Sequence, residues 1–155
     1  MPNTDCFICS KHRGDIPIPG GVIYEDNLVF SSHSMIPERQ TQAYLGYLIV
    51  EPKRHIEGLQ NLSKPESEAS GVLITRLSQA LVNSEKAEHI YLFVLGHNTP
   101  HLHFHLIPRY ANTPRKWWGI HLDEWPEAPR GGVIVINLLC DRLRTYLSSN
   151  PLAIE

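Results

Sequence analysis

Apolar and polar residues alternate along five short stretches of the chain, each of a length typical of a β-strand. Turn-forming residues separate these stretches, and Glu25-Asp26-Asn27 predicts a hairpin between the first two. The pattern therefore predicts a mostly antiparallel sheet. The predicted strands cover residues 21–24, 28–31, 44–50, 90–95 and 101–107.

Two further stretches have the apolar spacing of helices. The first begins at Ser63, an N-cap residue followed three positions later by Glu66, and continues through leucines at four-residue intervals. The second covers residues 133–147, although its opening Val-Ile-Val-Ile run is equally compatible with a strand. Residues 108–130, between the last predicted strand and this helix, hold four prolines and all three tryptophans, which predicts a long ordered loop or arm.

The composition is that of one ordinary folded domain. The chain has 155 residues, of which 42% are apolar, and no linker divides it. The net charge of −2 argues against binding to duplex nucleic acid. No apolar run reaches membrane-spanning length and the first residues lack a signal-peptide pattern, so we expect a cytoplasmic protein without a membrane partner.

Three histidines alternate with apolar residues near the middle of the chain. His101, His103 and His105 would share one face of an extended strand, and Pro108 disfavours a helix at the end of this segment. The outer two would be rooted about 13 Å apart at about 3.3 Å per residue. Since metal-bound nitrogens lie about 2.0–2.1 Å from the ion, a single ion would not collect all three unless the strand bends sharply. At least one histidine is left with another role.

A row of imidazoles is suited to chemistry at phosphorus. A neutral imidazole is a nucleophile when its second nitrogen keeps its proton by donating it to a backbone carbonyl. A neighbouring imidazole can protonate the leaving group, and water then opens the covalent nucleotidyl-imidazole. A single histidine in a strand is most often a satisfied polar residue, but three on one face indicate a site. A catalytic metal held by His101 and His103 with an acidic residue is a further reading.

Cys6 and Cys9 form a CxxC pair, which is half of a four-ligand zinc site. A second CxxC is absent from the sequence, so a closed site would have to include histidines. A redox-active pair and two unligated thiols are the alternatives. The remaining cysteine, Cys140, lies beside two leucines and is expected to be a small buried residue.

The histidine row resembles the His-apolar-His-apolar-His-apolar-apolar signature of the histidine triad (HIT) family, whose motif is highly specific. Residues 24–26 and 48–55, the latter ending in Pro-Lys-Arg-His, resemble the family's second and third strands and its Pro-Lys-x-His turn. The resemblance covers about Cys6 to Tyr110. It implies an α+β fold with a five-stranded antiparallel sheet and a long helix, commonly paired into a homodimer. We expect residues 1–110 to form the HIT domain and residues 111–155 a C-terminal helical extension packed on it.

By this resemblance the protein is a nucleotide-phosphate hydrolase, acting on dinucleoside polyphosphates or nucleoside phosphoramidates through a covalent nucleotidyl-histidine. His103 matches the nucleophile, and His105 matches the histidine that contacts the scissile phosphate and assists the leaving group. Asn98 and Thr99 precede the motif where the family often places a donor to the phosphate, and His97 could donate there instead. The alternative is a non-catalytic nucleotide-binding or zinc-stabilised interaction protein.

Two expectations concern the sugar and the metal. Many HIT proteins have an acidic residue that binds both ribose hydroxyls, and the alignment places His33 at that position. Bacterial members with a similar CxxC bind zinc together with the first triad histidine and the histidine of the Pro-Lys-x-His turn. The resemblance therefore implies a structural zinc, whose ligands here would be Cys6, Cys9, His55 and His101.

Overall fold

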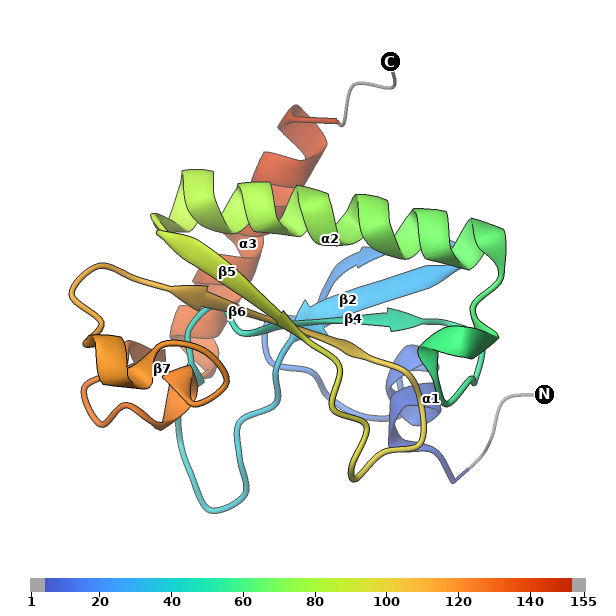
Figure 1. Cartoon of the computed structure of the whole chain (residues 1–155), viewed down its shortest axis with the longest axis horizontal. Helices are drawn as coiled ribbons and strands as arrows, with labels where there is room; N and C mark the ends of the chain where they lie inside the picture. Colours follow the sequence, from blue (N-terminus) through green and yellow to red (C-terminus); the bar gives the residue numbers. More distant parts are fainter. Residues whose placement is uncertain (1–4, 152–155) are drawn as a thin grey trace.

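The computed structural model describes residues 5–151 and contains a five-stranded antiparallel sheet (Figure 1). The strand order is β1-β2-β4-β6-β5, so β1 and β5 form the edges. The hairpin predicted at residues 25–27 is present, and the Asp26 carboxylate accepts the backbone N–H groups of Leu28 and Val29 there. The strands are β1 (Val22–Glu25), β2 (Val29–His33), β4 (Leu48–Pro52), β5 (His89–Phe93) and β6 (Phe104–Arg109).

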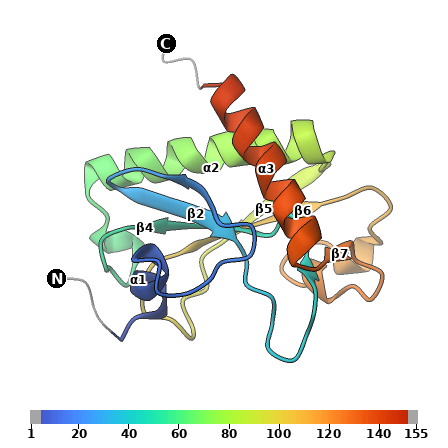
Figure 2. The ribbon, with the colours of Figure 1, turned by 180° about the vertical axis from the view of Figure 1, so that it is seen from behind.

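Two helices cover one face of this sheet. Helix α2 (Lys64–Glu85) begins at the predicted capping box of Ser63 and Glu66. Helix α3 (Val133–Ser149) packs against α2 and reaches β1 (Figure 2). The Val-Ile-Val-Ile run forms its first turn and is therefore helical, not a strand. The core between helices and sheet is built from side chains that alternate toward the helices along the strands. It includes Leu48, Val50, Leu73, Leu77, Leu106, Ile136 and Leu143, all no more than 2% exposed.

The C-terminal arm, residues 111–132, is ordered and folds back on the sheet. It contains the short 3-10 helices η2 (Arg115–Trp117) and η3 (Leu122–Glu124), and then β7 (Arg130–Gly131), which pairs with β3 (Ala43–Tyr44). Leu122 is fully buried against Tyr44 and Ile107. This second, smaller cluster ties the arm to the remainder of the chain.

The structure differs from the sequence analysis in one unpredicted helix and two strand boundaries. Helix α1 (Phe7–His12), which holds the second cysteine, was not predicted. The predicted strand 44–50 is broken between β3 and β4 at Gly46, whose φ of +80° suits glycine and whose added Cβ would lie 2.5 Å from the Tyr110 hydroxyl. The predicted strand 101–107 begins only at Phe104.

The late start of β6 changes the placement of the histidines. The Leu102 backbone N–H donates to the carbonyl of Ile56 rather than continuing the β4–β6 ladder, which begins at the pair of Val50 and Phe104. His101 and His103 therefore lie before the strand, and the expectation that all three imidazoles alternate on one strand face is wrong. Within residues 5–151 there is no helix of the length and apolar character needed to cross a membrane.

Candidate functional site

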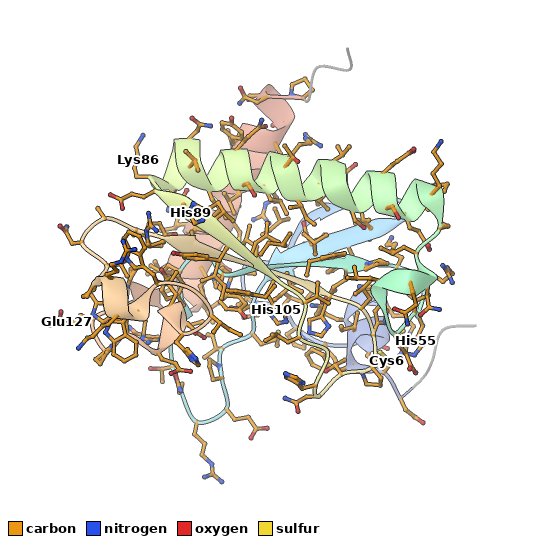
Figure 3. The ribbon with its side chains drawn as sticks, viewed as in Figure 1. Cys6, His55, Lys86, His89, His105 and Glu127 are labelled. Atoms are coloured by element: carbon orange, nitrogen blue, oxygen red, sulfur yellow. The ribbon has the colours of Figure 1, made fainter. Side chains whose placement is uncertain are left out.

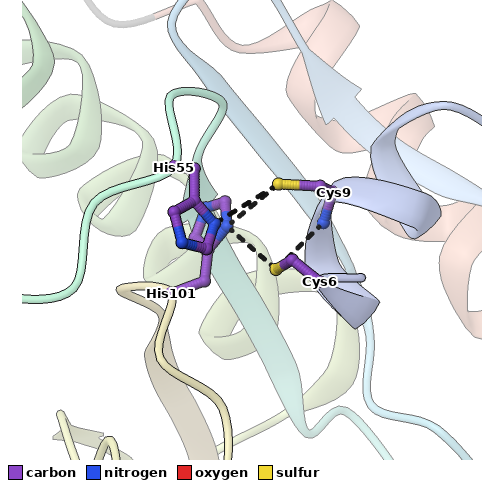
Figure 4. A group of neighbouring side chains, drawn as sticks. All are labelled: Cys6, Cys9, His55 and His101. Atoms are coloured by element: carbon purple, nitrogen blue, oxygen red, sulfur yellow. Dashed lines mark hydrogen bonds between the residues drawn. The ribbon is translucent and has the colours of Figure 1, made fainter. Parts of the chain in front are cut away.

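Two cysteines and two histidines from three separate parts of the chain meet beside α1 (Figure 4). Cys6 is the N-cap of α1 and Cys9 lies within it, His55 follows β4, and His101 precedes β6. Their four ligand atoms all lie within 4.8 Å of one another. These are the four residues that the resemblance to the HIT family implied.

The hydrogen bonding prepares this cluster for a metal. The Nε2–H of His101 donates to the carbonyl of Pro52 at 2.8 Å, which leaves the Nδ1 lone pair facing the two sulfur atoms. The Nδ1 to Sγ separations are 3.5 Å from His101 to Cys6, from His101 to Cys9, and from His55 to Cys9. Tetrahedral zinc, with bonds of about 2.3 Å to sulfur and 2.0–2.1 Å to nitrogen, would place these atoms about 3.6 Å apart. The donor set and its spacing fit zinc.

A cavity of about 310 Å³ lies beside this cluster, on the sheet face away from α2. Along β4 and β6, Ile49, Glu51 and His105 alternate with the core residues and point to this side. Figure 3 shows His105 toward the middle of the sheet, with Cys6 and His55 together near α1. Helix α1 and the arm contribute to the cavity wall, and further lining residues come from β2, from the segment around β3 and from the segment before β6. The α1 residues are Phe7, Ile8 and Lys11, the arm residues are Asp123 and Arg130, and the others are His33, Tyr44, Tyr47, Thr99 and His103.

His103 has a defined tautomer. Its Nδ1–H donates to the carbonyl of His101 at 2.7 Å, and a carbonyl can only accept, so Nδ1 carries the proton. Nε2 is then the nitrogen with the lone pair, on a partly buried ring that lines the cavity. His103 contacts His105 edge to face, with 4.7 Å between ring centroids.

His105 is held by a residue that the sequence did not indicate. Its Nδ1 bonds to the hydroxyl of Tyr47 at 2.7 Å, while its buried Nε2 has no partner among the described residues. Burial, and secondarily the neighbouring His103, lowers the pKa of His105 to about 4. The same burial raises the pKa of Tyr47, so its hydroxyl keeps its proton and can donate it to Nδ1. The arrangement favours a neutral His105 with Nε2–H as an unsatisfied donor.

The four predicted substrate-binding residues are placed differently from one another. Thr99 is partly buried and lines the cavity, whereas His97 and Asn98 are exposed and are not among the cavity-lining residues of the described chain. His33 lines the cavity and is buried. Its Nδ1–H donates to the carbonyl of Ser34, and its Nε2 accepts the backbone N–H of Gly46, so both nitrogens are occupied.

A buried ion-pair cluster forms the wall next to α1. The Glu51 carboxylate receives Lys11 Nζ at 2.5 Å on one oxygen and His12 Nε2 at 2.9 Å on the other. Burial alone would raise the pKa of Glu51, but the bonds from His12 and Lys11 outweigh it and the pKa lies below its ordinary value. The sequence signal that could have indicated this cluster is the single acid that ends the apolar run Leu48-Ile49-Val50-Glu51.

The fold and site geometry agree with the comparisons to known proteins. The HIT domain family model matches residues 16–112, and an uncharacterized HIT-like protein of Borreliella burgdorferi is 30% identical over 115 residues, covering 70% of this chain and 78% of the relative. This chain therefore belongs to the HIT family.

Solved structures with low sequence identity share the fold. A hypothetical histidine triad nucleotide-binding protein of Sulfolobus tokodaii matches with a TM-score of 0.70 at 19% identity, over 93% of each chain. A zinc-bound histidine triad family protein of Mycobacterium smegmatis matches with 0.68 at 18%, over 94% of each chain. The diadenosine triphosphate hydrolase of Plasmodium falciparum matches with 0.60 at 13%, over 83% of this chain and 77% of that one.

Proposed function

We propose that this protein hydrolyses a nucleotide at a phosphoric anhydride or phosphoramidate bond, through a covalent nucleotidyl-His103 intermediate. The observation that carries the proposal is the bond from His103 Nδ1–H to the His101 carbonyl, which leaves the Nε2 lone pair in a cavity large enough for a nucleotide portion. Membership in the HIT family, which includes a diadenosine triphosphate hydrolase among the structural matches, supports it.

In the first step His103 Nε2 attacks phosphorus. The new P–N bond forms as the bond to the leaving group breaks, and the bonding pair departs with the leaving oxygen or nitrogen. The carbonyl of His101 stabilises the positive charge that develops on the His103 ring, because it accepts the remaining N–H.

His105 handles the phosphoryl oxygen and the proton. Its Nε2, which has no partner among the described residues, would donate to a phosphoryl oxygen. An anionic phosphate beside it favours the protonated imidazole, which then gives its proton to the leaving group. In the second step His105 takes a proton from water, water attacks phosphorus, and the P–N bond to His103 breaks with its electron pair returning to Nε2.

The substrate contacts follow from the cavity walls. We propose that Thr99 donates to the phosphate, and that His97 and Asn98 reach it only if their exposed loop folds inward on binding. His33 forms part of the wall next to the sugar, through its ring face rather than through its nitrogens.

We propose a structural zinc ion held by Cys6, Cys9, His55 and His101. A bound zinc would neutralise two thiolates and leave no open position, which suits a structural site. The ligands fix α1, whose Phe7, Ile8 and Lys11 form one cavity wall. Reduced thiolate ligands also fit the cytoplasm, which we retain as the proposed compartment.

We propose a homodimer formed through β5. This strand lies at the sheet edge, and Leu92, Val94 and Leu95 on and after it are 39–49% exposed. Light scattering coupled to gel filtration would report twice the chain mass of 17.6 kDa. A measured mass of a single chain at micromolar concentration would contradict this assembly.

The decisive test compares His103→Ala with His121→Ala, an exposed histidine that lies outside β5 and is not among the cavity-lining residues of the described chain. With adenosine phosphoramidate and diadenosine polyphosphates as substrates, we expect His103→Ala to lose more than about a thousandfold in kcat/KM and His121→Ala to match the parent. Acid quench of the parent with labelled substrate should trap label on the protein. Parent protein that binds AMP but cleaves none of these substrates would instead support the non-catalytic nucleotide-binding alternative.

A further inference from the structure

We infer that Asp123, on the C-terminal arm, binds the two vicinal hydroxyls of the substrate's ribose and makes this enzyme selective for ribonucleotides. The inference rests on the proposed function, because it assigns the sugar contact within the same cavity. Asp123 lies beyond residues 16–112, the part matched by the family model.

The arm holds Asp123 in place from both sides. Leu122, immediately before it, is fully buried in the cluster with Tyr44 and Ile107. Arg130 pairs with Tyr44 through the β3–β7 ladder, and its guanidinium donates to the main-chain carbonyls of Asp123 and Trp125. A half-buried carboxylate is thereby fixed at the cavity wall rather than carried on a loose loop.

Two carboxylates line the cavity within the described residues, and only one has its oxygens engaged by other side chains. Both oxygens of Glu51 are taken, by Lys11 and by His12. The Asp123 carboxylate accepts its own backbone N–H and makes no bond to another side chain in the described part of the chain. Arg130 donates to main-chain carbonyls instead of pairing with this carboxylate. Asp123 is therefore the carboxylate available for a ligand.

The usual source of a sugar-binding acid is missing from β2. At the position where the resemblance to the HIT family places it stands His33, whose two nitrogens are committed to Ser34 and Gly46. The residues on either side of it, Ser32 and Ser34, are not acids. A sugar contact through a carboxylate must come from another element.

The chemistry of the surroundings selects the ribose. A carboxylate is an acceptor with two oxygens, so it suits two adjacent O–H donors and repels a phosphate. Asp123 lines the same cavity as Tyr47, the residue bonded to His105, so a nucleotide held there could reach both the carboxylate and the phosphate-handling group. The sugar is the part of a nucleotide joined to the phosphate, whereas the base has an apolar wall in Phe7 and Ile8.

The charge state of Asp123 agrees with this role. Burial, as the largest effect, raises the pKa of Asp123 above its ordinary value, because the carboxylate has lost part of its hydration. Two ribose hydroxyls would replace that hydration by direct hydrogen bonds to the charged group.

The test pairs a sugar change with a side-chain change. Adenosine 5′-phosphoramidate and its 2′,3′-dideoxy analogue are compared on the parent, on Asp123→Asn, and on Glu124→Gln, an exposed acid in the same 3-10 helix. We expect the parent to prefer the ribo substrate by at least about tenfold in kcat/KM, since hydrogen bonds to a charged group are involved. Asp123→Asn should lose most of this preference by slowing only the ribo substrate, and Glu124→Gln should keep it.

Several outcomes would overturn the inference while leaving the proposed function intact. A parent enzyme that cleaves both sugars equally would remove the sugar contact altogether. A fall of equal size for both substrates in Asp123→Asn would mean that Asp123 acts on Tyr47 and His105 instead, and a loss of preference among bases would place it at the base. Failure of the proposed function would be recognised separately, as the absence of His103-dependent cleavage. In that case the affinities of AMP and dideoxy-AMP, compared by calorimetry, would still report the sugar contact.

Discussion

The hydroxyl of Tyr47 lies 2.7 Å from Nδ1 of His105 and joins the residue before β4 to the cavity-facing histidine of β6. The bond occupies Nδ1 of His105 and so leaves Nε2 for the substrate that we propose. We expect Tyr47→Phe to lower kcat about three- to tenfold, the value of one neutral hydrogen bond, with a smaller change in KM. Tyr146→Phe, which removes a hydroxyl bonded to Asn83 on the helical face, is the matched control. Equal kinetics in both variants would show that the hydroxyl does not orient His105.

His105 should titrate near pH 4. Burial and then His103 lower its pKa, so NMR of the ring should show a neutral imidazole down to about that pH. The unfolded chain takes up this proton near its ordinary pKa of about 6.5, so the folded state loses stability as the pH falls from there toward 4. His103→Asn and bound AMP should each change the midpoint, the first upward by removing a like charge and the second upward by adding a negative one. A midpoint near 6.5 in the ligand-free parent would contradict the burial argument.

Zinc content should depend on Cys9 and not on Cys140. Mass spectrometry of metals in the purified parent should give about one zinc per chain, and Cys9→Ser should give far less because one of four ligands is lost. Removal of zinc should also lower stability, by about 4 kcal/mol where free zinc exceeds its dissociation constant a thousandfold. Cys140→Ser is the control, since its thiol is buried elsewhere, between α3 and Gly20, and burial raises its pKa to about 11. Substoichiometric zinc that is the same in all three proteins would rule out the site.

The Lys11–Glu51 pair should be costly to break on one side only. Both side chains are nearly inaccessible, at 4% and 1% exposure, so Glu51→Leu leaves a buried ammonium without a partner. We expect that variant to lose about 3–5 kcal/mol in denaturant unfolding, and the double variant Lys11→Met/Glu51→Leu to recover much of it. The exposed pair of Lys64 and Glu68 gives the comparison: Glu68→Gln should change stability by less than about 0.5 kcal/mol. A double variant whose loss of stability equals the sum of the losses in Glu51→Leu and Lys11→Met would show that the two buried charges do not depend on each other.

Local sequence signals were sufficient for most of the fold. The capping box at Ser63 and the turn at Asp26 act through neighbours in the chain, so their structures follow from nearby residues. The strand boundaries at Gly46 and Phe104 were missed because distant contacts set them. Gly46 is confined by Tyr110, and the segment before Phe104 is drawn away from the ladder by Ile56.

By itself the sequence determined the histidine row, the CxxC pair and the family to which they belong, because those features are spacings along the chain. Only the tertiary structure decided what surrounds them. Two of the surrounding contacts join residues 40 or more positions apart, namely Tyr47 with His105 and Glu51 with Lys11. The third places Asp123 of the arm, which lies outside the family motif, at the cavity. Such contacts depend on how the sheet, α1 and the arm pack together, and no periodicity along the chain encodes them.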